Sequence, residues 1–275
     1  MFPPAVLLPA ESSAEIKAIL MACMLKDIPV FRTNVDLMEH YALGLQAGDV
    51  LPVGSVEFMQ LAFTLAGVSE PPNISYHPAI VPFLYRPIHR WRIGELRTTP
   101  LPRPIFVKPH GTKLFTGFVL RAGQSMLALD PNDSIEAMAL AALSPNKSVW
   151  TSEVIHFESE WRYYVDGQGG ALLGEGVRYD ANGPADCVEP DADFVKTVAA
   201  AAWAALGHSF VLDVGVQKTT NKCLVVELND AWAIGLYGQA ITPVKYLEFL
   251  YGRWSSLVPM IPMVPVPAAS TVQGN

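Results

Sequence analysis

Two apolar strand candidates late in the chain, at 211–216 and 223–229, constrain the fold most, because they bring three oxygen-bearing side chains together. The six polar residues between them are short enough for a hairpin turn. Side chains alternate along a strand, so Glu227 and Asn229 share a face, and a turn centred on Thr220 sets Asp213 directly opposite Glu227. Two carboxylates facing each other across a ladder repel, whereas their oxygen atoms suit a hard cation such as Mg²⁺. The hairpin therefore predicts a metal site at Asp213, Glu227 and Asn229.

Composition excludes several classes of protein. The chain has 275 residues, of which 51% are hydrophobic, so one large domain or a few small ones can bury a core, and global disorder is excluded. The net charge of −7 argues against wholesale binding to nucleic acid. The three cysteines are widely spaced and odd in number, and neither a secretory signal nor a run of roughly 20 apolar residues is present. We therefore expect a cytoplasmic protein without a membrane span.

The order of helix and strand signals indicates several units. Residues 1–98 begin with a strand–helix–strand pattern typical of a small α/β unit. From residue 99 the sequence predicts mainly strands, with few intervening helices. One predicted strand, at 160–165, is expected to pair in a hairpin with a strand over 170–179. A helix is predicted over 243–257, and the remaining proline-punctuated tail is expected to be extended.

Two lysines upstream of the hairpin can meet phosphate oxygens. Lys108 ends the strand predicted at 104–108, and Lys113 follows it within a glycine-containing loop. Each is a compact, mobile cation suited to a polyphosphate. From this segment alone, two solvated surface lysines are an equally good interpretation, and the spacing does not match a Walker-type phosphate loop.

A strand between these elements adds two arginines. Glu160 and Arg162 are two residues apart and share one strand face, and Arg178 lies on the expected partner strand. The planar guanidinium of Arg162 can clamp a phosphate. Taken alone, a cross-strand ion pair on the outer face of a sheet explains Glu160 and Arg162 better, and Arg178 is equally ambiguous.

In this order the motifs resemble an ATP-grasp enzyme. The family pattern has a lysine at a strand end, a hinge strand, an acid two residues before an arginine, a metal-binding Asp, and a Glu-x-Asn. These parts match Lys108, Thr151-Ser-Glu-Val154, Glu160-x-Arg162, Asp213 and Glu227-x-Asn229. More narrowly, Lys-Pro-x-x-x-Lys-x-Phe-x-Gly, Glu-Trp-Arg and the segment Glu227-Leu-Asn-Asp-Ala-Trp-Ala-Ile-Gly-Leu-Tyr-Gly238 resemble the phage and bacterial clade named for an arginine and two lysines.

The resemblance implies an α+β ATP-grasp fold, in which two α+β subdomains grip ATP, preceded by a small α/β domain. The implied division is an N-terminal domain at 1–98, a small lid subdomain at 99–148, a large subdomain at 149–257 and a tail at 258–275. It also implies ATP and Mg²⁺ as cofactors and a phage association. Many ATP-grasp ligases carry Pro-Gly after Glu-x-Asn, whereas this chain has Asp230-Ala-Trp-Ala-Ile-Gly235, so the resemblance does not supply the acceptor substrate.

The implied activity is a carboxylate–amine ligase that forms an acylphosphate and then an amide, releasing ADP and phosphate. Its partners would be a carboxylate and an amine, either small molecules or peptides; homo-oligomerisation stays open. The implied nucleotide-binding residues are Lys108, Lys113, Thr151, Ser152, Glu153, Val154, Glu160 and Arg162. Arg162, Arg178 and Lys113 are the implied catalytic residues, and Asp213, Glu227 and Asn229 the implied metal ligands. An ATP-grasp kinase and a non-catalytic ATP-binding protein are the alternatives.

Overall fold

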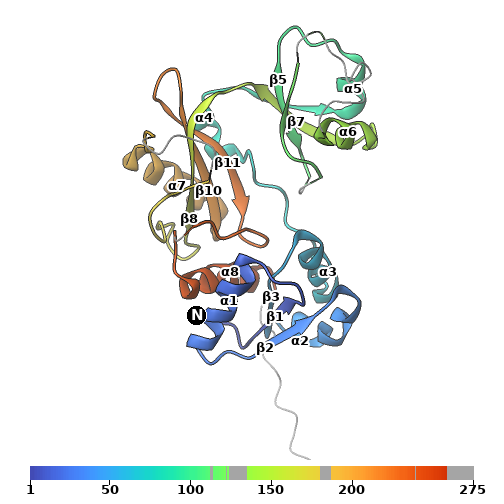
Figure 1. Ribbon diagram of the computed structural model, residues 1–275, viewed down its shortest axis with the longest axis vertical. Helices are drawn as coiled ribbons and strands as arrows, with labels where there is room; N and C mark the ends of the chain where they lie inside the picture. Colours follow the sequence, from blue (N-terminus) through green and yellow to red (C-terminus); the bar gives the residue numbers. More distant parts are fainter. Residues whose placement is uncertain (112–113, 122, 124–134, 180–186, 239, 259–275) are drawn as a thin grey trace, which may run out of the picture.

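The protein was analysed as a computed structural model, which describes residues 1–111, 114–121, 123, 135–179, 187–238 and 240–258. Three sheets follow one another along the chain, and Figure 1 shows them as three bodies. The N-terminal body lies at the bottom of this view, the body built on β8, β10 and β11 lies above it, and the body with β5 and β7 lies at the upper right. Among the described residues, no helix combines the length and apolar character needed to cross a bilayer.

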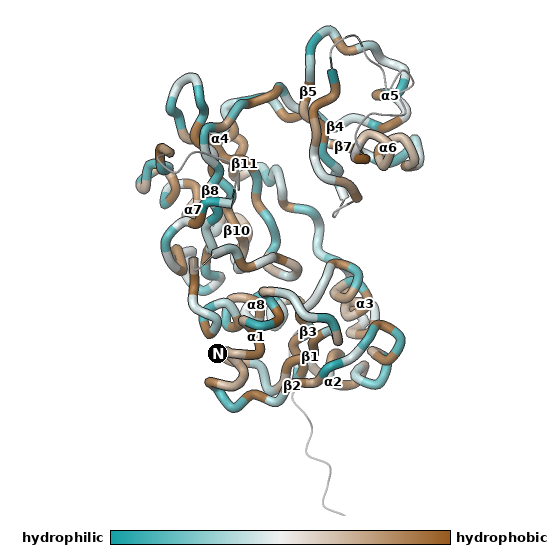
Figure 2. Tube along the Cα trace, in the orientation of Figure 1, coloured by the Kyte–Doolittle hydropathy of each residue, from teal (hydrophilic) through white to brown (hydrophobic). Residues whose placement is uncertain are grey.

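The N-terminal body is a parallel three-stranded sheet of order β2-β1-β3. Its central strand is fully apolar, and Figure 2 shows the same region as hydrophobic. The side chains of Ser13 and Ser55 cap two of its helices, and the second ends at Gly67 in the left-handed conformation. Its elements are β1 (Ala5–Pro9), α1 (Ala14–Leu25), β2 (Val30–Thr33), η1 (Val35–Tyr41), α2 (Ala42–Gln46), β3 (Val50–Pro52) and α3 (Val56–Ala66).

A connector then leads into the small sheet, an antiparallel sheet of order β4-β7-β5-β6. Its core consists of aliphatic side chains such as Val107, Leu140 and Val149. The connector holds η2 (Pro78–Ile80) and α4 (Val81–Leu84); the small sheet and its helices are β4 (Ile88–Arg92), α5 (Ile93–Thr98), β5 (Ile105–Pro109), β6 (Phe118–Leu120), α6 (Ile135–Ala142) and β7 (Ser148–Glu153). Because β4 pairs with β7, this sheet recruits chain from within the predicted N-terminal range 1–98.

The large sheet is antiparallel, of order β11-β10-β8-β9, and its two faces have different roles. One face carries alternate apolar residues such as Leu212 and Val214, which share a core with α7. The other face carries Arg162, Asp213 and Glu227. Its elements are β8 (Phe157–Val165), β9 (Val177–Arg178), α7 (Ala192–Leu206), β10 (Phe210–Gln217) and β11 (Cys223–Asp230).

The last helix, α8 (Pro243–Leu257), joins the large sheet to the N-terminal body. It packs against α1, and Figure 1 shows the two helices side by side. Tyr164 and Val211 from the large sheet, Trp232 from the segment after β11, and the aromatic residues of α8 belong to the same hydrophobic core as β1 and α3. This shared core fixes the N-terminal body against the polar face of the large sheet.

The expected partner strand over 170–179 is wrong in its length. Within 170–179 only β9 pairs regularly with β8, and further upstream the segment makes a single bridge between Leu172 and Val165. Gly170 has a φ of +70° and Gly174 packs against the backbone of Ala240, so neither position continues a regular ladder.

Candidate active site

The hairpin places the two acids opposite each other, as predicted. Asp213 on β10 lies opposite Glu227 on β11, and Asn229 lies opposite Val211. A register shift follows Asp213, and Arg86 donates hydrogen bonds to the carbonyl groups of Val225 and Val226 beside it, at 2.9 and 3.0 Å. The irregular stretch of β11 is therefore held from the connector, which keeps the two carboxylates in place.

Asp213 is paired with the neighbouring strand. Arg162 on β8 lies opposite Asp213, and its Nε and Nη2 donate to the two carboxylate oxygens, both at 2.8 Å. Asn229 Nδ2 donates to Asp213 Oδ2 at 2.9 Å. Asp213 is fully buried and Arg162 is 8% exposed, so this bidentate pair is protected from water and from screening salt.

Glu227 is paired with the other sheet. Lys108 at the end of β5 reaches its Oε2 and also donates to Ser75 Oγ at 3.1 Å. The Lys108 ammonium lies 5.2 Å from the centre of the Tyr76 ring. A line of charged groups thus runs from Arg162 through Asp213 and Glu227 to Lys108, and it joins the small and large sheets.

The neighbouring charges in this line favour the charged forms of Arg162, Glu227 and Lys108. Burial opposes the charge of Arg162, but the hydrogen bonds and charge of Asp213 raise its pKa above the ordinary value. Burial likewise opposes the charge of Glu227, yet the charge and hydrogen bond of Lys108 hold its pKa below the ordinary value. Lys108 responds reciprocally, since Glu227 raises its pKa in spite of burial. At Asp213, burial is the largest influence and raises the pKa.

Two tyrosines that sequence reasoning missed enclose Arg162. The guanidinium carbon lies 4.7 Å from the ring centre of Tyr237 and 5.2 Å from that of Tyr179. The Tyr179 hydroxyl donates to Glu160 at 2.7 Å. Tyr237 lies in the segment after Glu-x-Asn, and Tyr179 lies one residue beyond the noted Arg178, so their closeness to the motifs in the chain was the only available signal.

This line of charged groups borders a cleft of about 680 Å³. Its walls come from the connector, the end of β5 with the chain beyond it, β11, and the segment 232–237. Its lining residues include Glu15, Ser75, Lys108, Arg162, Glu227, Asn229, Trp232, Gly235 and Tyr237. The cleft lies where the two sheets and the N-terminal body meet, which is a suitable place for a substrate with several phosphates or carboxylates.

The predicted hinge residues and Arg178 lie away from this cleft. Thr151, Ser152 and Glu153 line a separate pocket of about 180 Å³, beside the link from β7 to β8 that also contains Val154. Arg178 lies opposite Trp161, so its position belongs to the face of the sheet opposite Arg162. Lys113 lies outside the described residues.

The two four-stranded sheets, with Lys108 of one meeting Glu227 of the other, correspond to the arrangement that the resemblance implies. The model of the ATP-grasp domain, family 2 of the clade named for an arginine and two lysines, matches residues 83–249, which is more than half of the chain. The chain belongs to this family. The match begins upstream of residue 99, as does the small sheet.

Solved structures confirm the α+β ATP-grasp fold. A RimK domain ATP-grasp protein from Sphaerobacter thermophilus aligns with a TM-score of 0.55 and 15% identity, covering 90% of this chain and 100% of that one. D-alanine–D-alanine ligase from Bacillus anthracis aligns with a TM-score of 0.53 and 12% identity, covering 94% and 99%. A search of curated proteins found no match to the sequence. At these identities the structures establish the fold alone.

Mg²⁺ fits part of the site in this ATP-grasp protein. Within the described residues, no three His, Cys, Asp or Glu side chains form a metal cluster, so a cation would need the amide of Asn229 beside two carboxylates. Asn229 uses its Nδ2 on Asp213, which leaves Oδ1 to accept or coordinate. Two carboxylates and an amide are hard oxygen ligands of the kind that Mg²⁺ uses together with substrate phosphates.

Proposed function

We propose that this ATP-grasp protein is an ATP-dependent carboxylate–amine ligase. The observation that carries the proposal is the line of Arg162, Asp213, Glu227 and Lys108 at a cleft between the two sheets. It combines cations for phosphate oxygens with oxygen ligands for a metal, and it includes no serine, threonine or cysteine nucleophile. That combination suits phosphoryl transfer, where catalysis is mainly positioning and electrostatic stabilisation.

The reaction we infer has two steps. A substrate carboxylate oxygen attacks the terminal phosphorus of ATP, and the bond to the bridging oxygen breaks, giving an acylphosphate and ADP. A neutral amine then attacks the acyl carbon; a C–N bond forms, the bond to the phosphate oxygen breaks, and phosphate leaves with the electron pair. The amine releases one proton to solvent or phosphate. Water must be excluded between the steps, because it would hydrolyse the acylphosphate.

The chain's own residues divide this work. Asp213, Glu227 and Asn229 would hold Mg²⁺, which supplies charge neutralisation at the phosphate oxygens. Lys108, Arg162 and Lys113 would orient the polyphosphate. On phosphate binding, Lys108 would exchange Glu227 for a phosphate oxygen, which would free Glu227 for the metal.

Three further roles complete the proposal. The link Thr151–Val154 would present backbone groups to the adenine ring, and Glu160 would contribute to the nucleotide site from β8. Arg178 would act on the transferring phosphoryl group only after a rearrangement, because its register position faces away from Arg162.

A thermal-shift titration with ATP and Mg²⁺ tests the nucleotide site. We expect ATP to raise the Tm of the wild type and of Lys147→Met, a control that removes an exposed lysine of the same sheet region. Lys108→Met should lose most of the shift, because it removes a charge-assisted contact worth about 1.5–3 kcal/mol. Equal shifts in all three proteins would refute the assignment of Lys108.

Product analysis tests the reaction. Release of ADP that depends on both a carboxylate and an amine, together with an amide product, is expected of a ligase. A phosphorylated hydroxyl product would identify a kinase instead. ATP binding without ADP formation across a broad panel of acceptors would identify a non-catalytic ATP-binding protein.

A further inference from the structure

A second pocket, of about 590 Å³, lies at the carboxyl ends of the N-terminal strands. It is lined by the loops that follow β1, β2 and β3, and it is closed by the 232–235 segment and by Tyr246 and Leu250 of α8. The strand order β2-β1-β3 means that the chain leaves β1 to one side and later returns on the other. Open α/β sheets bind ligands at such a switch point, outside the carboxyl ends of the strands.

This pocket adjoins the candidate ATP site. Glu15, Trp232, Ala233 and Gly235 line both the pocket and the larger cleft. A Cβ on Gly235 would lie 3.1 Å from Oε1 of Glu15, so this carboxylate is directly beside the segment that follows Glu-x-Asn. Glu15 therefore marks the junction between the two spaces.

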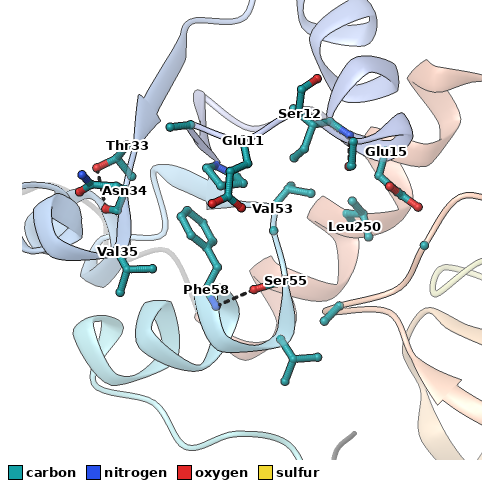
Figure 3. A pocket seen from close by; sticks show the side chains of 18 of the residues that line it. Glu11, Ser12, Glu15, Thr33, Asn34, Val35, Val53, Ser55, Phe58 and Leu250 are labelled. Atoms are coloured by element: carbon teal, nitrogen blue, oxygen red, sulfur yellow. Dashed lines mark hydrogen bonds between the residues drawn. The ribbon is translucent and has the colours of Figure 1, made fainter. Parts of the chain in front are cut away.

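The charge of the pocket is of one sign. Its charged lining residues are Glu11, Glu15 and Asp36, and among the described residues no lysine, arginine or histidine lines it. Figure 3 shows Glu11 between the Thr33–Asn34 loop and Val53, with Glu15 on the side of Leu250. Helix N-termini attract anions, but Glu15 already lies in the first turn of α1, and the side chain of Ser13 caps that helix. An anionic ligand would meet three carboxylates here.

The remaining lining is largely apolar, with Ile16, Val53, Val56, Phe58 and Leu250 between the acids. Methylene groups pack well on such a surface, while ammonium groups are attracted to the carboxylates. Resting on the ligase proposed above, we propose that this pocket binds the amine substrate, and that this substrate is an aliphatic diamine or polyamine. One amine would lie near Glu15, facing the acylphosphate in the adjoining cleft. A second, cationic amine would be held near Glu11 and Asp36.

Isothermal titration with three small probes tests the proposal: 1,4-diaminobutane, n-butylamine and 4-aminobutanoate, each with and without Mg²⁺ and ATP. The last two keep one amine on a four-carbon chain and end in a methyl group or a carboxylate instead of the second ammonium group. We expect 1,4-diaminobutane to bind most tightly and 4-aminobutanoate least. Equal or tighter binding of 4-aminobutanoate would overturn the proposal in favour of an amino-acid pocket.

Variants locate the binding. Glu15→Gln should weaken 1,4-diaminobutane about tenfold, and Glu11→Gln or Asp36→Asn about fivefold each, since these two acids are more exposed. Glu39→Gln removes an exposed acid of the same body outside the pocket and should change nothing. Equal loss in Glu39→Gln would reduce the effect to overall charge and overturn the site.

The result separates this proposal from the ligase itself. If ATP raises the Tm in a Lys108-dependent way but no probe amine binds, the amine pocket is wrong and the nucleotide site stands. If the amine binds in an acid-dependent way but ATP gives no shift, the pocket is supported and the proposed ligase fails.

Discussion

Arg162 and Asp213 form two parallel hydrogen bonds of 2.8 Å between neighbouring strands, at the centre of the large sheet. Asp213 lies directly opposite a second acid, Glu227, which is neutralised from the other sheet by Lys108. Each carboxylate thus has its own cation, which explains how two acids can share one row of a sheet. The same four groups are the ones that the proposed chemistry would use.

Breaking the Arg162–Asp213 pair should destabilise the fold strongly. We expect Asp213→Asn to lower the free energy of unfolding by about 3–5 kcal/mol, because it leaves a buried arginine without its counter-charge. The double variant Arg162→Met, Asp213→Leu should recover most of this loss, since it removes both desolvated charges. Urea unfolding of Arg162→Met, of Asp213→Leu and of the double variant measures the coupling. A loss below about 1 kcal/mol in Asp213→Asn would show that the pair is not held as described.

Glu227→Gln separates metal binding from nucleotide binding. The substitution keeps the shape of the side chain, removes a metal ligand and leaves Lys108 free for phosphate. We expect ATP affinity in EDTA to be unchanged or higher, and the gain on adding Mg²⁺ to fall about tenfold. Fluorescence titrations with an ATP analogue, with and without Mg²⁺, give both numbers. Glu175→Gln, at an exposed position, serves as the control, and an undiminished Mg²⁺ gain in Glu227→Gln would remove Glu227 from the metal site.

The local patterns of this sequence predicted the hairpin well and the surroundings less well. The pairing of Asp213 with Glu227 was predicted from a turn centred on Thr220, but the turn in the structure pairs Val216 with Cys223, and the register shift after Asp213 brings Glu227 opposite it. The helix predicted over 243–257 coincides with α8. Arg162 was undecided between an ion pair and a phosphate clamp, because one strand does not reveal its neighbour.

What the sequence did not reveal depends on long-range packing. Ser75 and Tyr76 lie in a proline-rich connector without periodicity, yet both reach Lys108. Glu15 is an ordinary first-turn acid of α1, and only the packing of the N-terminal body against the segment after β11 brings it beside Gly235. Such contacts join residues far apart in the chain, and no local pattern encodes them.

The Lys108–Glu227 pair predicts a pH dependence of stability with a definite sign. Lys108 holds the folded-state pKa of Glu227 below its ordinary value. The stabilisation that the charged Glu227 contributes to the folded state is therefore present above the pKa of Glu227 in the unfolded chain. It is lost as the pH falls through the pKa of Glu227 in the folded protein. The difference in unfolding free energy between wild type and Glu227→Gln should be constant from about pH 5 to 8 and shrink below about pH 4. Urea unfolding across this range measures it; a difference that grows on acidification would reverse the sign and contradict the pairing.

Tyr237 should affect turnover more than stability. Its ring lies 4.7 Å from the Arg162 guanidinium but is 43% exposed, so Tyr237→Leu should cost only about 0.5–1 kcal/mol of stability. The Arg162 guanidinium would lose one of the two aromatic rings that restrict its orientation. We therefore expect a lower kcat for ADP release, with a smaller change in KM for ATP. Tyr179→Phe is the matched comparison, because it keeps the ring beside Arg162 and removes only the hydrogen bond to Glu160. Steady-state kinetics on both variants decide the point: if Tyr179→Phe lowers kcat as much as Tyr237→Leu, the hydroxyl contact to Glu160, and not the aromatic enclosure, positions Arg162.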